Sequence, residues 1–117
     1  SVKWATCNVG ATFIDDWGSH FAWGEVQPKN YYHWITYKWC DGTSDKFSKY
    51  CTDTIYGEVD NKTILDIEDD AANANWGGNW RMPTIEEWKE LLRYFFIKDR
   101  KAALLPTFFA SSVSSRQ

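Results

Sequence analysis

The chain has 117 residues, the size of one domain that can bury a modest core. Its net charge is −3 and no basic stripe is visible, so we expect no nucleic-acid partner. No apolar run reaches membrane-spanning length, and the opening residues SVKWATCNVG lack the basic and then apolar layout of a signal peptide. Either a signal peptide has been cleaved or the chain begins inside a longer protein, and we expect the second.

Aromatic residues make up 18% of the chain and include eight tryptophans, which is high for a globular domain. Such side chains bring large buried areas and stacking surfaces. The composition indicates either an irregular, loop-rich domain or an aromatic binding face, and it leaves both open.

The first half of the chain predicts short strands separated by turns. Residues 2–9 alternate in a strand-like pattern that ends at Gly10. Residues 13–25 mix aromatics with Asp, Gly and Ser, which favours turns and a short helix, with residues 21–23 as a brief buried strand. Residues 31–40, YYHWITYKWC, are aromatic and β-branched and predict a strand, and residues 41–63 predict a polar connection.

Residues 65–76, LDIEDDAANANW, predict a short helix. Asp66 can cap it, and the acidic residues that follow would lie in its first turn, where the helix dipole favours negative charge. A calcium site is the alternative for this acidic cluster. The oxygen-ligand spacing of an EF-hand is absent, however, and we expect no metal and no cofactor.

The stretch WGGNWRMPTIEEW, residues 76–88, predicts the end of one helix and the start of another. Gly77 and Gly78 can stop the first helix because glycine tolerates a left-handed backbone. Thr84 and Glu87 have the spacing of a capping box, and a helix is expected over residues 85–97. Structural roles are expected for Arg81, Thr84 and Trp88. The helix carries an apolar stripe at Ile85, Trp88, Leu91, Leu92, Phe95 and Phe96.

The cysteines are Cys7, Cys40 and Cys51, so at most one pair can form. Cys40 and Cys51 bracket a short polar loop that a disulfide could close, and we expect that disulfide. The alternative is a pair of free thiols. No CxxC motif is present, and neither histidine has an evident metal-binding partner.

A candidate ligand-binding face lies in the aromatic segment. Aromatic faces stack on sugar rings, and several side chains of this segment could form such a face. The alternative is that they fill the core or line an irregular loop. The candidate residues are Tyr31, Tyr32, Trp34, Tyr37 and Trp39.

Several separated motifs resemble one bacterial family. The segments SVKWATCNVGA, FAWGE, YKWC, KYC, DNKTILDIEDDAA and NWGGNWRMPTIEEWKEL together resemble the Fibrobacter succinogenes major paralogous domain. The core WRMPTIEEW is also similar to a signature of the formylglycine-generating-enzyme superfamily, which has the C-type-lectin-like fold.

The resemblance implies an α+β, C-type-lectin-like fold that is incomplete. It would have two short helices, a small antiparallel sheet and long aromatic-rich loops. The likeness spans residues 1 to about 94, so residues 1–97 are expected to be the lectin-like N-terminal portion and residues 98–117 a divergent tail. The strands and the Cys-Thr-Trp-like stretch that usually follow this helix in the family are replaced by that tail.

The resemblance implies a secreted or cell-surface bacterial domain, not an enzyme, with a ligand-binding or adhesion role toward a glycan or a surface protein. One alternative is a truncated fragment without a function of its own. Another is an enzyme like the formylglycine-generating relatives, which use cysteines in the C-terminal half. No cysteine follows Cys51 here, and no nucleophile elbow, phosphate loop or zinc motif is present.

Overall fold

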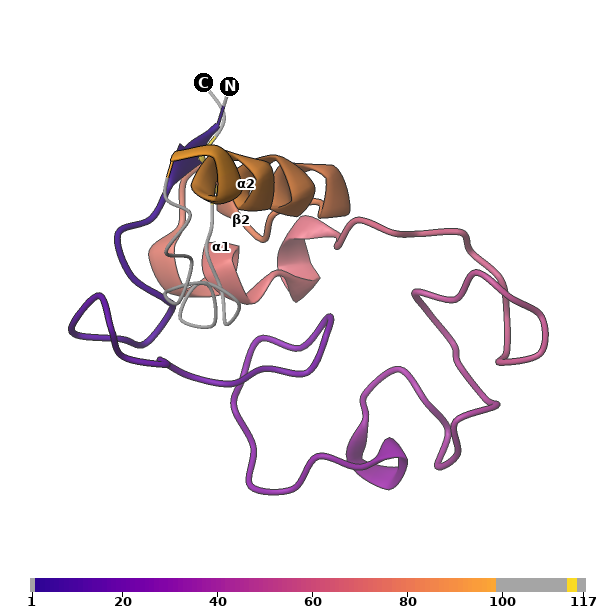
Figure 1. Cartoon of the computed structure of the whole chain (residues 1–117). Coiled ribbons are helices and arrows are strands. Elements are labelled where there is room, and N and C mark those ends of the chain that lie inside the picture. Colours follow the sequence, from indigo (N-terminus) through magenta and orange to yellow (C-terminus); the bar gives the residue numbers. More distant parts are fainter. Residues whose placement is uncertain (1, 99–113, 116–117) are drawn as a thin grey trace.

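The computed structural model describes residues 2–98 and 114–115 (Figure 1). Its helices are α1 (Ala71–Trp76) and α2 (Ile85–Lys98), with two single 3₁₀ turns, η1 (Trp34–Thr36) and η2 (Ile67–Asp69). Three two-residue strands complete the regular structure: β1 (Lys3–Trp4), β2 (Trp80–Arg81) and β3 (Ser114–Ser115). The rest of the described chain follows turns and extended loops.

The strands are much shorter than the sequence predicts. β3 is antiparallel to β1 and to β2, with Ser115 opposite Lys3 on one side and opposite Trp80 on the other. These two-residue ladders fall short of the expected antiparallel sheet, and the arrangement does not establish a lectin-like fold. The coarser expectation of two helices joined to long aromatic-rich loops is confirmed.

The strands predicted at residues 2–9, 21–23 and 31–40 are either much shorter than expected or are not strands at all. The first stops at Trp4, and the chain turns at Asn8, whose side chain donates hydrogen bonds to the carbonyls of Asp16 (3.4 Å) and Trp17 (3.2 Å). Residues 13–25 contain neither helix nor strand. Alternation of apolar residues cannot form a strand where no neighbouring strand is available to accept its backbone hydrogen bonds.

The C-terminal helix of the described chain is confirmed, together with its capping box. Glu87 accepts a hydrogen bond from the Thr84 amide (2.8 Å), and the Thr84 hydroxyl accepts one from the Glu87 amide (3.2 Å). Glu87 also forms two hydrogen bonds with the Arg81 guanidinium, at 2.9 and 2.6 Å. One buried carboxylate therefore starts α2 and ties it to β2.

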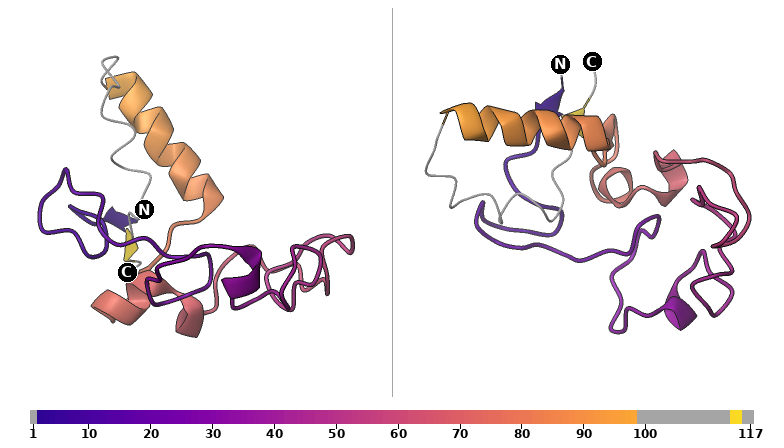
Figure 2. Two further views of the ribbon diagram at one scale, coloured as in Figure 1. Left: turned by 90° about the horizontal axis from the view of Figure 1, so that it is seen from below. Right: turned by 45° about the vertical axis from the view of Figure 1, so that its right-hand side comes forward.

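The apolar stripe of α2 is narrower than the sequence suggests. Trp88 is half-buried and its ring lies 5.5 Å from that of Trp4, so its expected structural role is confirmed. Ile85 and Phe96, at the two ends of the stripe, are 62% and 56% exposed. Figure 2 shows α2 at the edge of the molecule.

The predicted cap of the first helix is displaced by one turn. Asp66 precedes η2 but makes no capping bond, whereas Asp70 accepts hydrogen bonds from the amides of Ala72 (2.9 Å) and Asn73 (3.2 Å) and so caps α1. Asp70 also accepts one from the Met82 amide (2.8 Å), which holds β2 against α1. Gly77 ends the helix with a φ of 69°, as predicted.

The core is small. Among the described residues, Val9 and Ala72 are its fully buried members, and half-buried hydrophobic side chains pack against them. Trp76 and Trp80 pack edge to face with ring centroids 5.3 Å apart, and both are half-buried against the core. The covering side chains are Phe21, Trp76, Trp80 and Met82.

Side-chain carboxylates organise the irregular part of the chain. Asp60 accepts hydrogen bonds from the amides of Tyr50 (2.8 Å), Cys51 (3.0 Å) and Lys62 (3.1 Å). Burial favours the neutral acid, but these bonds outweigh it and hold the pKa of Asp60 below its ordinary value. In this part of the chain, local hydrogen bonds from backbone amides to side chains take the place of the hydrogen bonds between strands of a sheet.

The expected tail at residues 98–117 lies outside the described residues, apart from Lys98 and β3. None of the helices in the described part of the chain has the length and apolar character needed to cross a bilayer.

Candidate functional site

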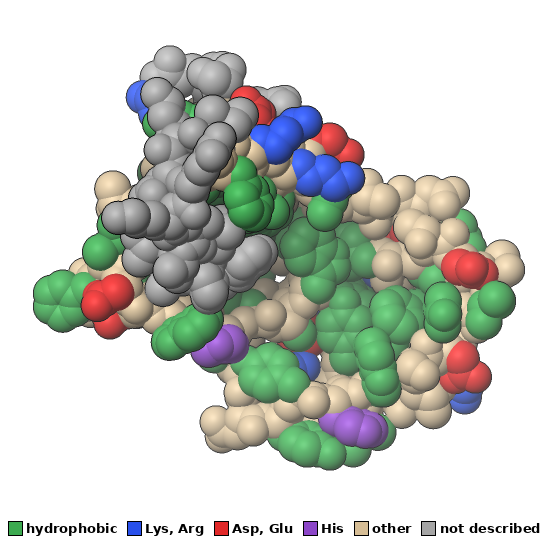
Figure 3. Space-filling model, in the orientation of Figure 1, with side chains coloured by type: hydrophobic (Ala, Val, Ile, Leu, Met, Phe, Trp, Pro, Cys, Tyr) green, Lys and Arg blue, Asp and Glu red, His purple; other side chains and the backbone are tan. Residues whose placement is uncertain are grey.

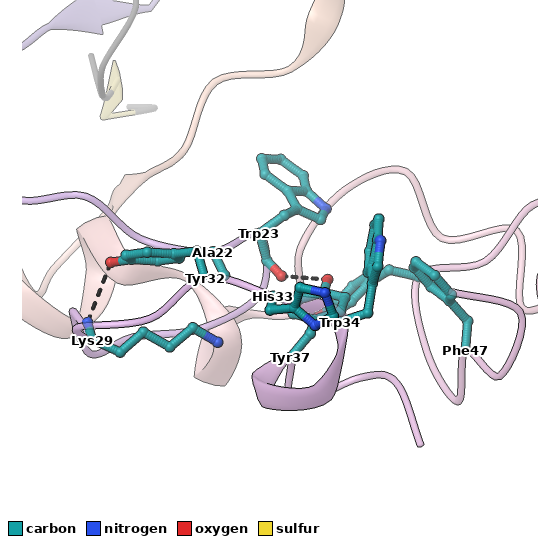
Figure 4. A pocket seen from close by; sticks show the side chains of 9 residues that line it. Ala22, Trp23, Lys29, Tyr32, His33, Trp34, Tyr37 and Phe47 are labelled. Carbon is teal, nitrogen blue, oxygen red and sulfur yellow. Dashed lines mark hydrogen bonds between the residues drawn. The ribbon is translucent and has the colours of Figure 1, made fainter. Parts of the chain in front are cut away.

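An open groove of about 600 Å³ lies among the aromatic loops. This volume falls within the range of small-molecule sites, roughly 300 to 1,000 Å³. Figure 3 shows hydrophobic side chains gathered over this part of the surface, and Figure 4 shows the groove itself. Its wall is formed by Ala22, Trp23, Lys29, Tyr32, His33, Trp34, Tyr37, Phe47 and Tyr50.

Three aromatic rings form the centre of the groove. Trp34 lies 6.1 Å from Tyr37 and 5.7 Å from Phe47, and Tyr37 lies 5.8 Å from Phe47, all between ring centroids. The interplanar angles of 55° to 70° are those of tilted and edge-to-face pairs, which the ring quadrupoles favour. Trp34 is nevertheless 47% exposed, so it presents part of its indole to solvent.

The turn η1 aims Trp34 into the groove. His33 caps the turn, with its Nδ1 accepting a hydrogen bond from the Ile35 amide (3.3 Å). The Thr36 hydroxyl accepts one from the His33 amide (3.2 Å) and donates one to the Tyr31 carbonyl (2.8 Å). This closed set of bonds explains why the aromatic segment forms a turn instead of the predicted strand.

Phe47 reaches the groove from a different loop. Its amide donates to the Tyr56 carbonyl (2.8 Å), and its carbonyl accepts from the Glu58 amide (2.9 Å). Gly57 crosses beside it with a φ of 145°, and a Cβ there would lie 2.3 Å from the Phe47 carbonyl oxygen. Only glycine allows so close a crossing of the two backbones.

The tyrosine hydroxyls of the groove are all bound to the protein. Tyr37 donates to the Trp23 carbonyl and Tyr32 to the His20 carbonyl, both at 2.7 Å. Tyr50 donates to Asp69 at 2.6 Å. These bonds hold the rings in place and leave their faces as the surface that a ligand meets.

Lys29 is the cationic side chain of the groove. Its ammonium lies 2.8 Å from a Glu25 carboxylate oxygen and 2.8 Å from the Thr36 carbonyl oxygen. It also stands over the rings of Tyr32 and Tyr37, 5.5 and 5.9 Å from their centroids. Figure 4 shows Lys29 and Tyr32 at one end of the groove, with Trp34 and Phe47 toward the other.

A network of charges supports the groove from behind. The Lys49 ammonium contacts Asp69 (2.6 Å) and Asp66 (2.7 Å) and stands 4.8 Å from the centroid of the Trp39 ring. The hydrogen bonds that Lys49 donates to these two carboxylates, first Asp66 and then Asp69, raise its pKa. Trp39 donates its indole N–H to the Gly24 carbonyl (2.9 Å), so the network links the aromatic loops to η2.

The acidic cluster named as an alternative calcium site belongs to this network. Carboxylate oxygens of Asp66, Glu68 and Asp69 lie within 4.8 Å of one another. Lys49 and Lys62 bring positive charge to it, the latter 2.7 Å from Asp66. Asp66 and Asp69 of this cluster therefore pair with lysines in the structure.

Some of the predicted ligand-binding residues line the groove and others do not. Tyr32, Trp34 and Tyr37 line the groove. Tyr31 does not, because it stacks on the outer side of His33 with centroids 5.7 Å apart and is 56% exposed. Trp39 lies behind the groove and packs edge to face on Tyr50 at 5.7 Å.

Sequence reasoning missed several groove residues. Trp23 was assigned to a buried strand but is 44% exposed. Phe47 stands alone among polar residues in DGTSDKFSKY, and an isolated apolar side chain in a polar loop is the signal that could have found it. Lys29 and His33 carried no such signal.

The predicted disulfide between Cys40 and Cys51 is wrong. Both cysteines are free thiols, as is Cys7. The buried Cys51 thiol donates to the Asp53 carbonyl (3.1 Å), and Cys40 is held by a bridge to Phe47. The loop is thus closed by backbone bonding around Phe47, without a covalent link. Burial, and then the neighbouring Cys51, raise the pKa of the Cys40 thiol.

Tyr37 is expected to make the protein sensitive to alkali. Burial, with added repulsion from Cys40 and Glu25, raises the pKa of Tyr37 to about 12. Because the folded pKa lies above the unfolded value of about 10, the stabilisation from the neutral phenol is complete below about pH 10 and is lost between about pH 10 and 12. We expect Tyr37→Phe to be about 1 kcal/mol less stable than the parent chain at pH 7, because the hydrogen bond to Trp23 is lost. Between about pH 10 and 12 the variant should lose less stability than the parent does.

Urea denaturation across this pH range measures the effect. Tyr94→Phe is the matched control, since Tyr94 lies on α2 and is 56% exposed. Equal alkaline losses in the two variants would contradict the assignment to Tyr37.

Comparison with known proteins adds no relative. No protein-family model matches the chain, and neither a curated protein nor a solved structure is significantly similar to it.

Proposed function

We propose that this chain is a non-enzymatic binding domain whose aromatic groove holds a sugar ring of a glycan. The observation that carries the proposal is an open groove of about 600 Å³ with exposed aromatic rings around it. Tyr32, Trp34 and Trp23 are each 44% to 47% exposed, so the groove offers several ring faces at once.

Such a surface suits a pyranose ring. One face of a pyranose presents C–H groups, which pack on the electron-rich face of an aromatic ring, while its hydroxyls point outward toward donors and water. The rings are already held by hydrogen bonds from Tyr32 and Tyr37 to backbone carbonyls, so little side-chain entropy is lost on binding.

We propose that the domain acts in adhesion, within a secreted or cell-surface bacterial protein. The resemblance to the Fibrobacter succinogenes major paralogous domain supports this placement. An enzyme of the formylglycine-generating type is a weaker alternative, because the Cys40 thiol has a raised pKa and the Cys51 thiol is buried and hydrogen-bonded.

The small core favours a second candidate, a fragment without a function of its own. Val9 and Ala72 are the buried hydrophobic cluster, while Phe13, Trp17 and Ile55 are among the large side chains that are mostly exposed. A cooperative loss of near-UV circular dichroism on heating would favour the binding domain over the fragment.

Trp34→Ala is expected to weaken glycan binding by roughly tenfold or more. The substitution removes the indole that stacks on a ligand and also contacts Phe47. Binding is measured by calorimetric titration with the best glycan from an array screen of the unaltered chain.

Tyr94→Ala is the matched control for this variant. It removes an exposed aromatic side chain from α2, outside the groove, and its affinity should stay within about twofold of the parent. The proposal fails if no glycan binds a cooperatively folded chain, or if Trp34→Ala binds as the parent does.

A further inference from the structure

Of the described residues that line the groove, Lys29 is the one that carries an ammonium group, and this charge is already neutralised. Lys29 Nζ lies 2.8 and 3.1 Å from the two oxygens of Glu25, and the side chains of Lys29 and Glu25 are only 20% and 13% exposed. Glu25 is not itself on the groove wall. A ligand in the groove therefore meets a shielded ion pair.

We propose that the groove selects uncharged sugar rings over acidic ones, and that Glu25 sets this preference by neutralising Lys29. The inference rests on the proposed function and deepens it. Glu25 is a specificity-determining residue that acts through Lys29, without touching the ligand.

The contacts of Lys29 explain the selectivity against anions. Its ammonium is shared among Glu25, the Thr36 carbonyl (2.8 Å) and the faces of Tyr32 and Tyr37. A carboxylate on the ligand would have to displace Glu25 and would be repelled by it at close range. A cationic ligand would be repelled by Lys29 in the same way.

The remaining polar atoms of the groove suit neutral hydroxyls. The tyrosine hydroxyls are bound to the protein, and the Nδ1 of His33 accepts from Ile35. Within residues 2–98, the structure gives no hydrogen-bond partner to the indole N–H groups of Trp23 and Trp34 or to the Nε2 of His33. These uncharged groups can form hydrogen bonds with sugar hydroxyls, which are also uncharged.

The test compares two ligands of equal length and different charge. The full chain is titrated with a neutral glucan hexasaccharide and with hexagalacturonate at low salt, where charge effects are strongest. We expect the parent to prefer the neutral ligand by about tenfold or more. Glu25→Gln should gain about tenfold or more for hexagalacturonate and change by no more than about twofold for the glucan.

Two further variants make the result specific to the ion pair. Glu90→Gln removes the same charge from an exposed position on α2 and should leave both affinities within about twofold. Lys29→Met leaves the Glu25 carboxylate unpaired and should gain affinity for a cationic glucosamine hexamer, so the inference stays testable even if Glu25→Gln does not fold.

The outcomes separate the two proposals. A parent that binds hexagalacturonate as tightly as the glucan overturns the inference and leaves glycan binding intact, and so does a folded Glu25→Gln with no gain for the acidic ligand. A folded parent that binds none of the saccharides overturns both.

Discussion

Replacing Glu87 with glutamine is expected to lower the free energy of unfolding by about 3 kcal/mol. The carboxylate is 8% exposed and bonds to both Arg81 nitrogens, at 2.9 and 2.6 Å. Glutamine can still accept the hydrogen bond from the Thr84 amide, so the capping box is partly kept. The cost arises because the Arg81 guanidinium, which also packs in a half-buried position, loses its charged partner.

Urea denaturation followed by tryptophan fluorescence measures this loss. Glu86→Gln is the matched control, since Glu86 is an exposed carboxylate in the same first turn of α2 and only its interaction with the helix dipole is removed. Its cost should stay below about 1 kcal/mol. Equal losses in the two variants would show that the Arg81 pair does not stabilise the fold.

The ion pair between Arg81 and Glu87 should also make the stability of the protein depend on pH in the acidic range. The bonds from Arg81, followed by those from Thr84, lower the pKa of Glu87 to about 2. Because this folded pKa lies below the unfolded value, the stabilisation is fully present above about pH 4.5 and is lost as the pH falls toward 2. The parent chain should lose stability across this window, and Glu87→Gln should lose less of it.

Asp70→Ala is expected to destabilise the protein by about 2 to 3 kcal/mol. The side chain is 3% exposed and performs two tasks. Its Oδ1 caps α1 by accepting hydrogen bonds from the amides of Ala72 and Asn73. Its Oδ2 accepts a hydrogen bond from the Met82 amide at 2.8 Å. Alanine removes the cap and leaves the Met82 amide without its acceptor.

Asp70→Ser separates the two tasks. Serine is a good N-cap but its single, shorter hydroxyl cannot also reach Met82, so about half of the loss should be recovered. Urea midpoints of the three proteins give the comparison. If serine and alanine cost the same, the cap contributes nothing and the tether to Met82 accounts for the whole effect.

The helical region could be predicted from the sequence because its signals are local. The capping box needs only Thr84 and Glu87, three residues apart, and the stop at Gly77 needs only a left-handed backbone. One of the errors in this region, the cap at Asp66, has a partly tertiary cause. Lys49, from well before it in the chain, and the nearby Lys62 draw the Asp66 carboxylate into ion pairs, and Asp70 caps the helix instead.

The structure of the aromatic segment, residues 31–40, could not be predicted from local signals. The composition of the segment predicts a strand. Within the described part of the chain, however, strand-like pairing of this segment is limited to the single bridge between Cys40 and Phe47, and the bonds around His33 and Thr36 favour a turn. The predicted disulfide is absent as well, and backbone bonds around Phe47 close the loop between Cys40 and Cys51.

The sequence by itself determined the capped helix α2, the glycine stop after α1 and the presence of an aromatic segment rich enough to form a binding face. Each depends on residues within a few positions of one another. Only the tertiary structure decided which rings line the groove. Trp34 meets Phe47, Tyr37 bonds to Trp23, and Lys49 pairs with Asp69. Such contacts join separate loops through carbonyls, ring faces and charges, and none of these leaves a periodic pattern along the chain.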